Sequence, residues 1–196
     1  SGCFDRVIVS TDDYEIKKIA TEAGAEVPFM RDIKLASDFA PTVDVISDLI
    51  SKLISTGDRI DNVCCLYPTS VFINSIILNK GLRLLDLNRP SYVISISSYS
   101  HPIQRALKIN DCGMVNLINS NEGETRTQDT ITNYFDAGQF YWGRFDTWLS
   151  KKPLLNSDAL PIILSAHSFQ DIDTPEQWII AEQIYKLSKE GSVNHA

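Results

Sequence analysis

Short runs of β-branched and apolar residues alternate with stretches whose apolar positions recur every three or four residues. The runs predict buried strands at 6–10, 26–29, 62–67, 92–96, 138–142 and 160–164. The helical spacing predicts helices between Asp12 and Gly24, between Thr42 and Gly57, over 73–88, over 143–149 and after Thr174. This alternation predicts an α/β fold with a mainly parallel sheet covered by helices on both faces.

The middle of the chain departs from this alternation. Short apolar alternations around Asn110-Asp-Cys-Gly predict a hairpin over 99–118 with its turn at 111–113. The polar residues 119–133 predict a loop. We therefore expect a single domain over 1–190, with an excursion at 99–135 that serves as a subdomain, a lid or a dimer contact. A frayed tail follows at 191–196.

The strongest chemical signal lies between the last strand and the last helix. Thr174, Pro175 and Gln177 fit an N-cap, a first helical position and a capping box. Asp171 and Asp173 precede them and face the same side if the backbone is extended. Open α/β sheets bind ligands at this edge, so the pair predicts a magnesium site shared with substrate phosphates. The alternative is that both aspartates favour the positive end of the helix.

Other polar residues follow the predicted strands. Asp12 and Asp13 lie on the same predicted edge, and we interpret them as helix caps. Thr69 and Ser70 fit either an ordinary cap or a contact with a phosphate or sugar oxygen. Arg126 lies in a polar loop, where it is either solvated or clamps a carboxylate through two hydrogen bonds. No glycine-rich phosphate loop or nucleophile motif is present.

Composition narrows the classes of partner. The 196 residues carry a net charge of −7 and no basic run, which argues against nucleic acid or an anionic membrane surface. No stretch reaches the roughly 20 apolar residues needed to cross a bilayer, and no signal peptide is visible. The four cysteines lack CxxC spacing, so we expect a reduced, cytoplasmic compartment.

Six segments stand in the order seen in one enzyme family. These segments are 4–12, 25–29, 66–70, 126–128, 136–142 and 171–174, and they are spread over nearly the whole length of the chain. They resemble the cytidylyltransferases that activate nine-carbon keto-sugar acids, namely the CMP-sialic acid synthetases and the pseudaminic acid cytidylyltransferases. Tyr67 and the segment 136–142 favour the pseudaminic branch. Val71-Phe-Ile replaces the Pro-Leu-Arg that often follows in sialate enzymes.

The resemblance implies a fold and a reaction. The fold is a three-layer, Rossmann-like nucleotide-diphospho-sugar transferase fold, in which the excursion contributes to a homodimer. In the reaction the anomeric hydroxyl of pseudaminic acid attacks the α-phosphate of CTP, giving a CMP-sugar and pyrophosphate. The alternatives are a synthetase for sialic or another nonulosonic acid, and a degenerate domain that binds a sugar acid or a partner without turnover.

The resemblance also implies roles for individual residues. By motif match, Asp171 and Asp173 hold Mg²⁺ between the nucleotide phosphate and the sugar. Arg31 and Thr42 fall where the family contacts the nucleotide, and Arg126 is the expected partner of the sugar carboxylate. The other positions expected along the sugar are Tyr67, Thr69, Ser70, Gln128 and Gln139.

One expectation concerns the beginning of the chain. The family begins with a strand and a basic, glycine-containing loop that wraps the triphosphate, and this sequence opens after them. That strand would lie in the middle of the sheet. We therefore expect exposed apolar surface where it is missing, and no activity from this chain alone.

Overall fold

The computed structural model describes residues 2–118, 130–165, 169–170 and 172–193, with the side chains of the last helix described as far as 187. The chain forms two compact units, Ser1–Ile94 with Gln139–Ile162 and Ser95–Gly138 with Ile163–Ala196. The single domain expected over 1–190 stays a prediction. None of the described helices is long and apolar enough to cross a lipid bilayer.

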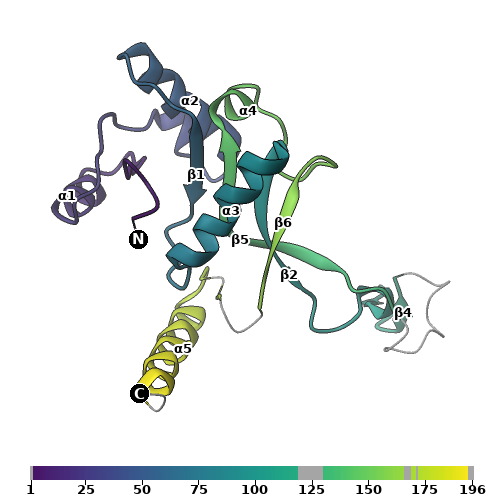
Figure 1. The fold of residues 1–196 in the computed structure, drawn as a ribbon. Helices are drawn as coiled ribbons and strands as arrows, with labels where there is room; N and C mark the ends of the chain where they lie inside the picture. The colour runs from purple at the N-terminus through teal and green to yellow at the C-terminus, as the bar shows by residue number, and fades with distance from the viewer. Residues whose placement is uncertain (1, 119–129, 166–168, 171, 194–196) are drawn as a thin grey trace. The chain divides into compact units, whose positions relative to one another are not determined.

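The elements follow the expected order along the chain (Figure 1). Up to the middle strand they are α1 (Tyr14–Glu22), η1 (Ile33–Leu35), α2 (Thr42–Ser55), β1 (Asn62–Leu66), α3 (Ser75–Asn88) and β2 (Tyr92–Ser98). The remainder are η2 (Ile103–Arg105), β3 (Leu107–Ile109), β4 (Val115–Leu117), β5 (Tyr134–Arg144), α4 (Phe145–Leu149), β6 (Leu160–Leu164) and α5 (Pro175–Val193).

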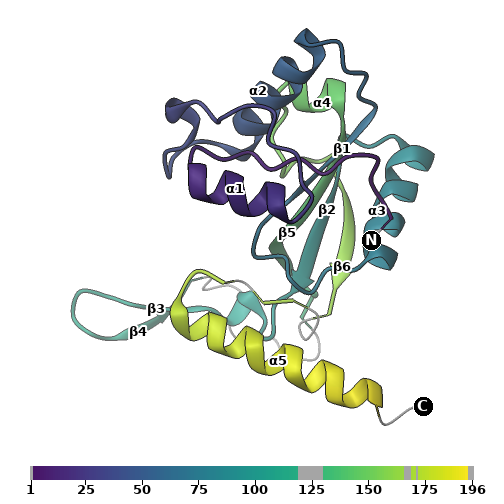
Figure 2. The ribbon, with the colours of Figure 1, turned by 90° about the vertical axis from the view of Figure 1, so that its left-hand side faces the viewer.

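The main sheet has four strands in the order β1-β5-β2-β6. β5 runs antiparallel to β1, from the pair Asn62↔Arg144 to the pair Leu66↔Phe140. The α/β class is confirmed, and the sheet is mixed rather than uniformly parallel. The reason is that the chain passes from β2 into the excursion without a crossover helix, so the alternation that predicts parallel strands breaks off there. The predicted hairpin is confirmed as the antiparallel pair β3–β4 (Figure 2).

The predicted strands at 6–10 and 26–29 form only one isolated parallel bridge, Ile8↔Glu26. Its hydrogen bonds run from Val9 N to Glu26 O (2.9 Å) and from Glu26 N to Val7 O (2.8 Å). The Arg6 guanidinium reinforces the bridge, because it reaches Glu26 at 2.6 Å and Asp58 at 2.9 Å. Arg6, near the start of the chain, is thereby paired with both Glu26 and Asp58.

Aromatic side chains fill the two faces of the β1–β5 pair. On one face Trp142 stacks on Phe4, with ring centroids 5.4 Å apart, and lies against Gly81 of α3. A Cβ atom at Gly81 would stand 2.7 Å from Trp142 Cδ1, so glycine is what lets α3 approach. Figures 1 and 2 show α3 running along the sheet and α2 beside α4. The fully buried side chains include Ile50, Leu85, Tyr92, Phe140 and Trp148.

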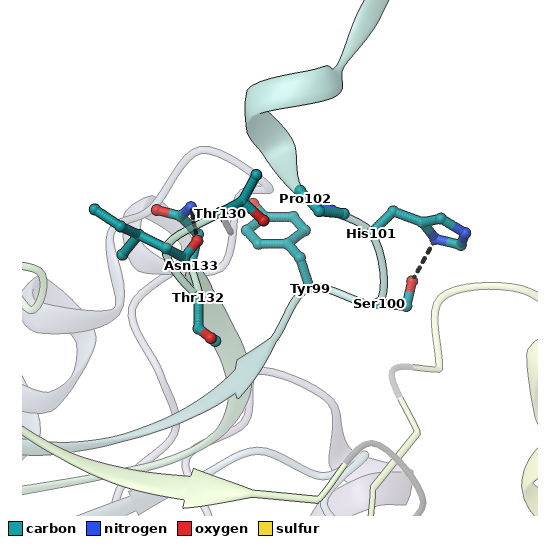
Figure 3. A pocket seen from close by; sticks show the side chains of 8 residues that line it. Tyr99, Ser100, His101, Pro102, Thr130, Thr132 and Asn133 are labelled. Atoms are coloured by element: carbon teal, nitrogen blue, oxygen red, sulfur yellow. Dashed lines mark hydrogen bonds between the residues drawn. The ribbon is translucent and has the colours of Figure 1, made fainter. Parts of the chain in front are cut away.

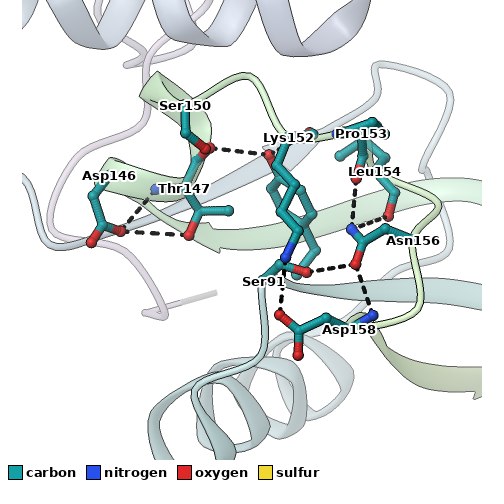
Figure 4. A network of polar contacts seen from close by, with 10 residues as sticks. Ser91, Asp146, Thr147, Ser150, Lys152, Pro153, Leu154, Asn156 and Asp158 are labelled. Carbon is teal, nitrogen blue, oxygen red and sulfur yellow. Dashed lines mark hydrogen bonds and ion pairs between the residues drawn. The ribbon is translucent and has the colours of Figure 1, made fainter.

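A polar network closes the connection between α4 and β6 (Figure 4). Asn156 Oδ1 accepts hydrogen bonds from Ser91 Oγ (3.0 Å) and from Asp158 N (2.8 Å). Asn156 Nδ2 donates to Pro153 O at 2.6 Å, and Lys152 pairs with Asp158 at 3.0 Å. These bonds satisfy backbone groups of a loop that has no regular structure of its own.

Helix starts agree with the sequence to within two residues. Asp13, not Asp12, caps α1, because its Oδ1 accepts from Glu15 N (2.6 Å) and Ile16 N (3.0 Å). The N-cap of α2 is Pro41, and Thr42, where the sequence predicts the helix to begin, is the first helical residue. The Thr174–Gln177 capping box of α5 is confirmed, as shown below.

Candidate functional site

The turn that follows β1 is fastened to β5 by a single carbonyl group. Gln139 O accepts hydrogen bonds from Tyr67 N (3.2 Å) and from Ser70 Oγ (2.5 Å). Ser70 N also donates to Tyr67 O at 2.9 Å, which closes the Pro-Thr-Ser turn. Ser70 and Gln139 are buried, whereas Tyr67 and Thr69 are half-buried. The fold thus brings together four positions that the resemblance assigns to the sugar.

Tyr67 also joins this turn to the start of α2. Its hydroxyl lies 2.7 Å from Thr42 Oγ1, and either oxygen can be the donor. A residue expected on the nucleotide side therefore meets a residue expected on the sugar side. Twenty-five positions separate them in the sequence, so no local pattern indicates this contact.

Tyr141 is a neighbour of this group that sequence reasoning missed. Its ring meets the Tyr67 ring edge-on, with centroids 5.5 Å apart and planes at 61°. Cys65 pairs with Tyr141 across β1 and β5, so Tyr67, two residues further, lies diagonally on the same face. The available signal was the two-residue spacing between Gln139 and Tyr141, which puts both on one face of a strand.

Arg31 is held against the segment that precedes α1. Its Nε donates to Ser10 Oγ at 3.1 Å, its Nη2 donates to Ser10 O, and its backbone N donates to Thr11 O at 2.8 Å. Burial raises the pKa of Cys65 to about 12, and the positive charge of Arg31 opposes that rise. Its three bonds to Ser10 and Thr11 fix Arg31 beside the segment that leads into α1.

Asp173 lies at the start of α5, in the second unit. The helix is capped by Thr174 and Gln177: Gln177 Oε1 accepts from Thr174 N (2.9 Å), and Thr174 Oγ1 accepts from Gln177 N (3.3 Å). Asp173 joins this cap through its backbone N, which donates to Gln177 Oε1 at 2.6 Å. Its side chain is exposed, and no bond from a described residue to its carboxylate is seen. The carboxylate is not the capping group.

Three expected site residues, Asp171, Arg126 and Gln128, lie outside the described residues. Within the described parts of the chain, no group of three or more His, Cys, Asp or Glu side chains forms a metal site. A cation at Asp173 would therefore need ligands from the substrate or from Asp171.

A cavity of about 270 Å³ lies in the second unit, but it holds none of the expected site residues (Figure 3). In its wall the Ser100 hydroxyl and His101 Nδ1 are 3.1 Å apart. Its lining consists of Tyr99, Ser100, His101, Pro102, Thr130, Ile131, Thr132 and Asn133.

The sequence is similar to those of known nucleotide-sugar enzymes. The cytidylyltransferase family model matches residues 1–167. A pseudaminic acid cytidylyltransferase from Campylobacter jejuni is 33% identical over 192 residues, which are 98% of this chain and 83% of that protein. A CMP-N,N'-diacetyllegionaminic acid synthase from Legionella pneumophila is 27% identical, with the same two coverages.

Among solved structures, a CMP:2-keto-3-deoxy-manno-octonic acid synthetase complexed with CTP is similar in fold. Its TM-score is 0.60 at 14% identity, over 94% of this chain and 81% of that one. At such low identity the likeness concerns the fold alone. The match over 1–167 and the identity to the Campylobacter protein concern the sequence itself, and by both measures this chain belongs to the cytidylyltransferase family.

Proposed function

We propose that the protein transfers CMP from CTP to the anomeric hydroxyl of pseudaminic acid and releases pyrophosphate. The observation that carries this proposal is the 33% identity, over 98% of the chain, to a protein of that name. In the reaction the anomeric oxygen forms a bond to the α-phosphorus while the bond to the bridging oxygen of pyrophosphate breaks. The hydroxyl proton leaves to water or a base. Such a displacement needs positioning and neutralised phosphate charge more than covalent help from the protein.

The contacts of the first unit support a division of the site. Arg31 and Thr42 are assigned to the nucleotide, and Tyr67 and Thr69 to the sugar. The Thr42 and Tyr67 hydroxyls are 2.7 Å apart, which supports a site in which the two substrates meet near this pair of oxygens. On the sugar side we also assign Arg126, as partner of the sugar carboxylate, and Gln128.

Ser70 and Gln139 are assigned to the same side with a particular means of action. Ser70 is only 8% exposed, and its hydroxyl is engaged with the Gln139 carbonyl. A hydrogen bond between two buried groups fixes the backbone that carries them. We therefore infer that this pair holds the turn in the orientation in which Tyr67 and Thr69 meet the sugar.

Mg²⁺ is assigned to Asp171 and Asp173. Carboxylate oxygens suit this hard cation, and the Asp173 carboxylate is exposed and lies outside the α5 cap. The bound cation would neutralise charge on the phosphate oxygens. Because Mg²⁺ keeps few protein ligands when it binds phosphates, two carboxylates are a sufficient protein share.

We also infer the finer architecture that the resemblance implies, a three-layer Rossmann-like domain over 1–190 with homodimer contacts in the excursion. The β3–β4 hairpin supports the dimer. Leu107, Ile109, Met114 and Val115 are each more than half exposed. Monomeric proteins rarely leave contiguous apolar surface of this kind in water, and a second copy of this chain would cover it.

The test is pyrophosphate release from CTP with purified pseudaminic acid and Mg²⁺, measured, like the kinetics of the variants, on this chain preceded by the strand and basic loop with which the family begins. N-acetylneuraminic acid and N,N'-diacetyllegionaminic acid are the comparison substrates, the latter because of the Legionella relative. Preference for pseudaminic acid is the expected result. Preference for another acid would mean that the protein is a synthetase for that nonulosonic acid. No release with any of the three would support a binding domain without turnover.

A further inference from the structure

The side chain of Tyr67 makes two contacts with other elements of the first unit, one hydrogen bond and one aromatic contact. Its hydroxyl meets Thr42 Oγ1, and its ring meets Tyr141. The side chain is half-buried and follows the end of β1, where the backbone turns away from the sheet. These two contacts tie the side chain to α2 and to β5.

Tyr141 has the opposite character. It is 3% exposed and lies within β5, where its backbone is paired with Cys65 of β1. A buried side chain on a regular strand is fixed by its packing, whereas the Tyr67 side chain is only half-buried. The edge-on contact therefore transmits the rigidity of the sheet to Tyr67. Such aromatic pairs contribute about 0.5–1.5 kcal/mol beyond the area they bury.

The contact determines what the Tyr67 hydroxyl can do. When two hydroxyl groups bond to each other, one donates its proton and the other keeps its own. The kept proton can be donated to a substrate oxygen, and the remaining lone pairs can accept from a substrate hydroxyl. Those groups point in a defined direction only if the Tyr67 ring keeps one orientation. Without the Tyr141 edge the ring could turn about its first two side-chain torsions, and the Thr42 bond would be lost with it.

We propose that Tyr141 is a positioning residue that holds Tyr67 in the orientation where its hydroxyl meets Thr42 and binds the sugar acid. The inference rests on the proposed function. Tyr141 acts through Tyr67 and does not itself contact substrate. It therefore influences the sugar more than the nucleotide, to which Arg31 is assigned as well as Thr42.

The experiment compares Tyr141→Leu with Tyr141→Phe in steady-state pyrophosphate release. Tyr141→Leu removes the ring edge, and we expect the KM for pseudaminic acid to rise roughly 3- to 10-fold, with the KM for CTP within about twofold. Tyr141→Phe keeps the edge and should restore the wild-type KM. In a Tyr67→Ala background, adding Tyr141→Leu should raise the sugar KM no further, because the residue it positions is gone.

Tyr92→Leu is the matched control. Tyr92 is equally buried and meets Trp148 edge-on, with centroids 4.9 Å apart and planes at 64°, but Tyr92 and Trp148 are not expected site residues. It should lower the melting temperature without changing the sugar KM. If Tyr141→Leu does not fold, Tyr141→Met, which keeps more of the volume, takes its place.

Three results would overturn the positioning role. These are an equal rise in both KM values, an additive effect in the Tyr67→Ala background, and an equal change in sugar KM from Tyr92→Leu. Failure of the proposed function looks different, because the wild-type protein would then release no pyrophosphate with any of the sugar acids. In that case the positioning role falls with it.

Discussion

At the scale of single residues, the Asp173 carboxylate carries the metal proposal. Replacing it with Asn keeps the shape and the backbone bond to Gln177 but removes the charge that attracts a cation. We expect Asp173→Asn to lower magnesium-dependent turnover by at least about 100-fold, with the circular dichroism spectrum unchanged. The measurement is pyrophosphate release across a magnesium titration.

Glu176→Gln is the control for Asp173→Asn, because Glu176 is another exposed carboxylate in the first turn of α5. It should leave turnover within about twofold. An equal loss in both variants would mean that general charge near the helix, rather than a metal ligand, matters. Unchanged turnover in Asp173→Asn would remove the metal assignment.

The paired thiols of β1 make stability depend on pH. Burial raises the pKa of Cys65 from 9.0 to about 12 and raises that of Cys64 as well. A folded-state pKa above the unfolded value means that the contribution to stability is complete below about pH 9 and is lost as the pH rises toward 12. We expect the urea midpoint to fall from pH 8.5 to 10.5, as a rough range.

Replacing both thiols, as Cys64→Ala with Cys65→Ala, should flatten this fall, and Cys112→Ala should leave it unchanged because Cys112 is exposed. Burial also raises the pKa of Tyr92 to about 12, so Tyr92 contributes to the fall in stability with rising pH. Part of the pH dependence should therefore remain in the double variant. An undiminished slope in the double variant would show that the thiols do not carry the effect.

At the scale of elements, the sequence predicted well where the determining bonds are local. The α5 cap joins Thr174 to Gln177, three residues away, so its pattern can be read directly. The α1 cap differs by one residue because Asp12 and Asp13 are both good acceptors. The bond from Asp13 N to Thr11 Oγ1 fixes the turn before the helix, and Thr11 O in turn accepts from the distant Arg31 N.

Removing the α5 cap gives a local test. Thr174→Ala deletes the oxygen that accepts from Gln177 N, and loss of an N-cap typically costs about 1 kcal/mol. We expect amide exchange in the first turn of α5 to accelerate by roughly fivefold. Gln183→Ala, at an exposed position of the same helix, should leave the exchange unchanged. Equal acceleration in both would indicate fraying of the whole helix.

The contact between α3 and β5 gives a second test at this scale. Alanine favours a helix interior over glycine by about 1 kcal/mol, but a Cβ at Gly81 would stand 2.7 Å from a ring atom of buried Trp142. Overpacking of a core costs about 1–3 kcal/mol, so the clash should win. We expect Gly81→Ala to lower the free energy of unfolding by about 1–2 kcal/mol, measured in urea.

Lys80→Ala, at the exposed neighbouring position, is the control and should change the free energy of unfolding by less than about 0.5 kcal/mol. A stabilised Gly81→Ala would mean that Trp142 moves aside.

At the scale of the whole molecule, the pattern of apolar residues could not predict which distant segments pair. The antiparallel place of β5 depends on how the chain returns from the excursion, and no period in 138–142 encodes a direction. The same register brings Tyr141 to Tyr67, which is why Tyr141 was missed. The resemblance to the family named Thr42, Tyr67 and Ser70 as site residues; the structure shows the contact between Thr42 and Tyr67 and the bond from Ser70 to Gln139, and the roles of these residues stay predictions.

Association of two copies is the prediction at this scale. Ile109 and Val115 are 75% and 62% exposed and lie opposite each other in the hairpin, so they share one face. We expect the wild-type protein to sediment as a dimer and Ile109→Asp to shift it toward the monomer at micromolar concentration. Asn116→Asp adds the same charge at an exposed hairpin position and should leave the dimer intact. A monomeric wild-type protein would contradict the proposal.

The close approach of α3 to Trp142 has an evolutionary consequence. Positions 81 and 142 share one limited volume, so a methyl group gained at one must be offset by atoms lost at the other. In an alignment of cytidylyltransferases the two columns should covary, with indole tolerated only opposite glycine and smaller apolar side chains opposite alanine or serine. Drift at either column is then constrained by its partner, although neither belongs to the proposed substrate contacts.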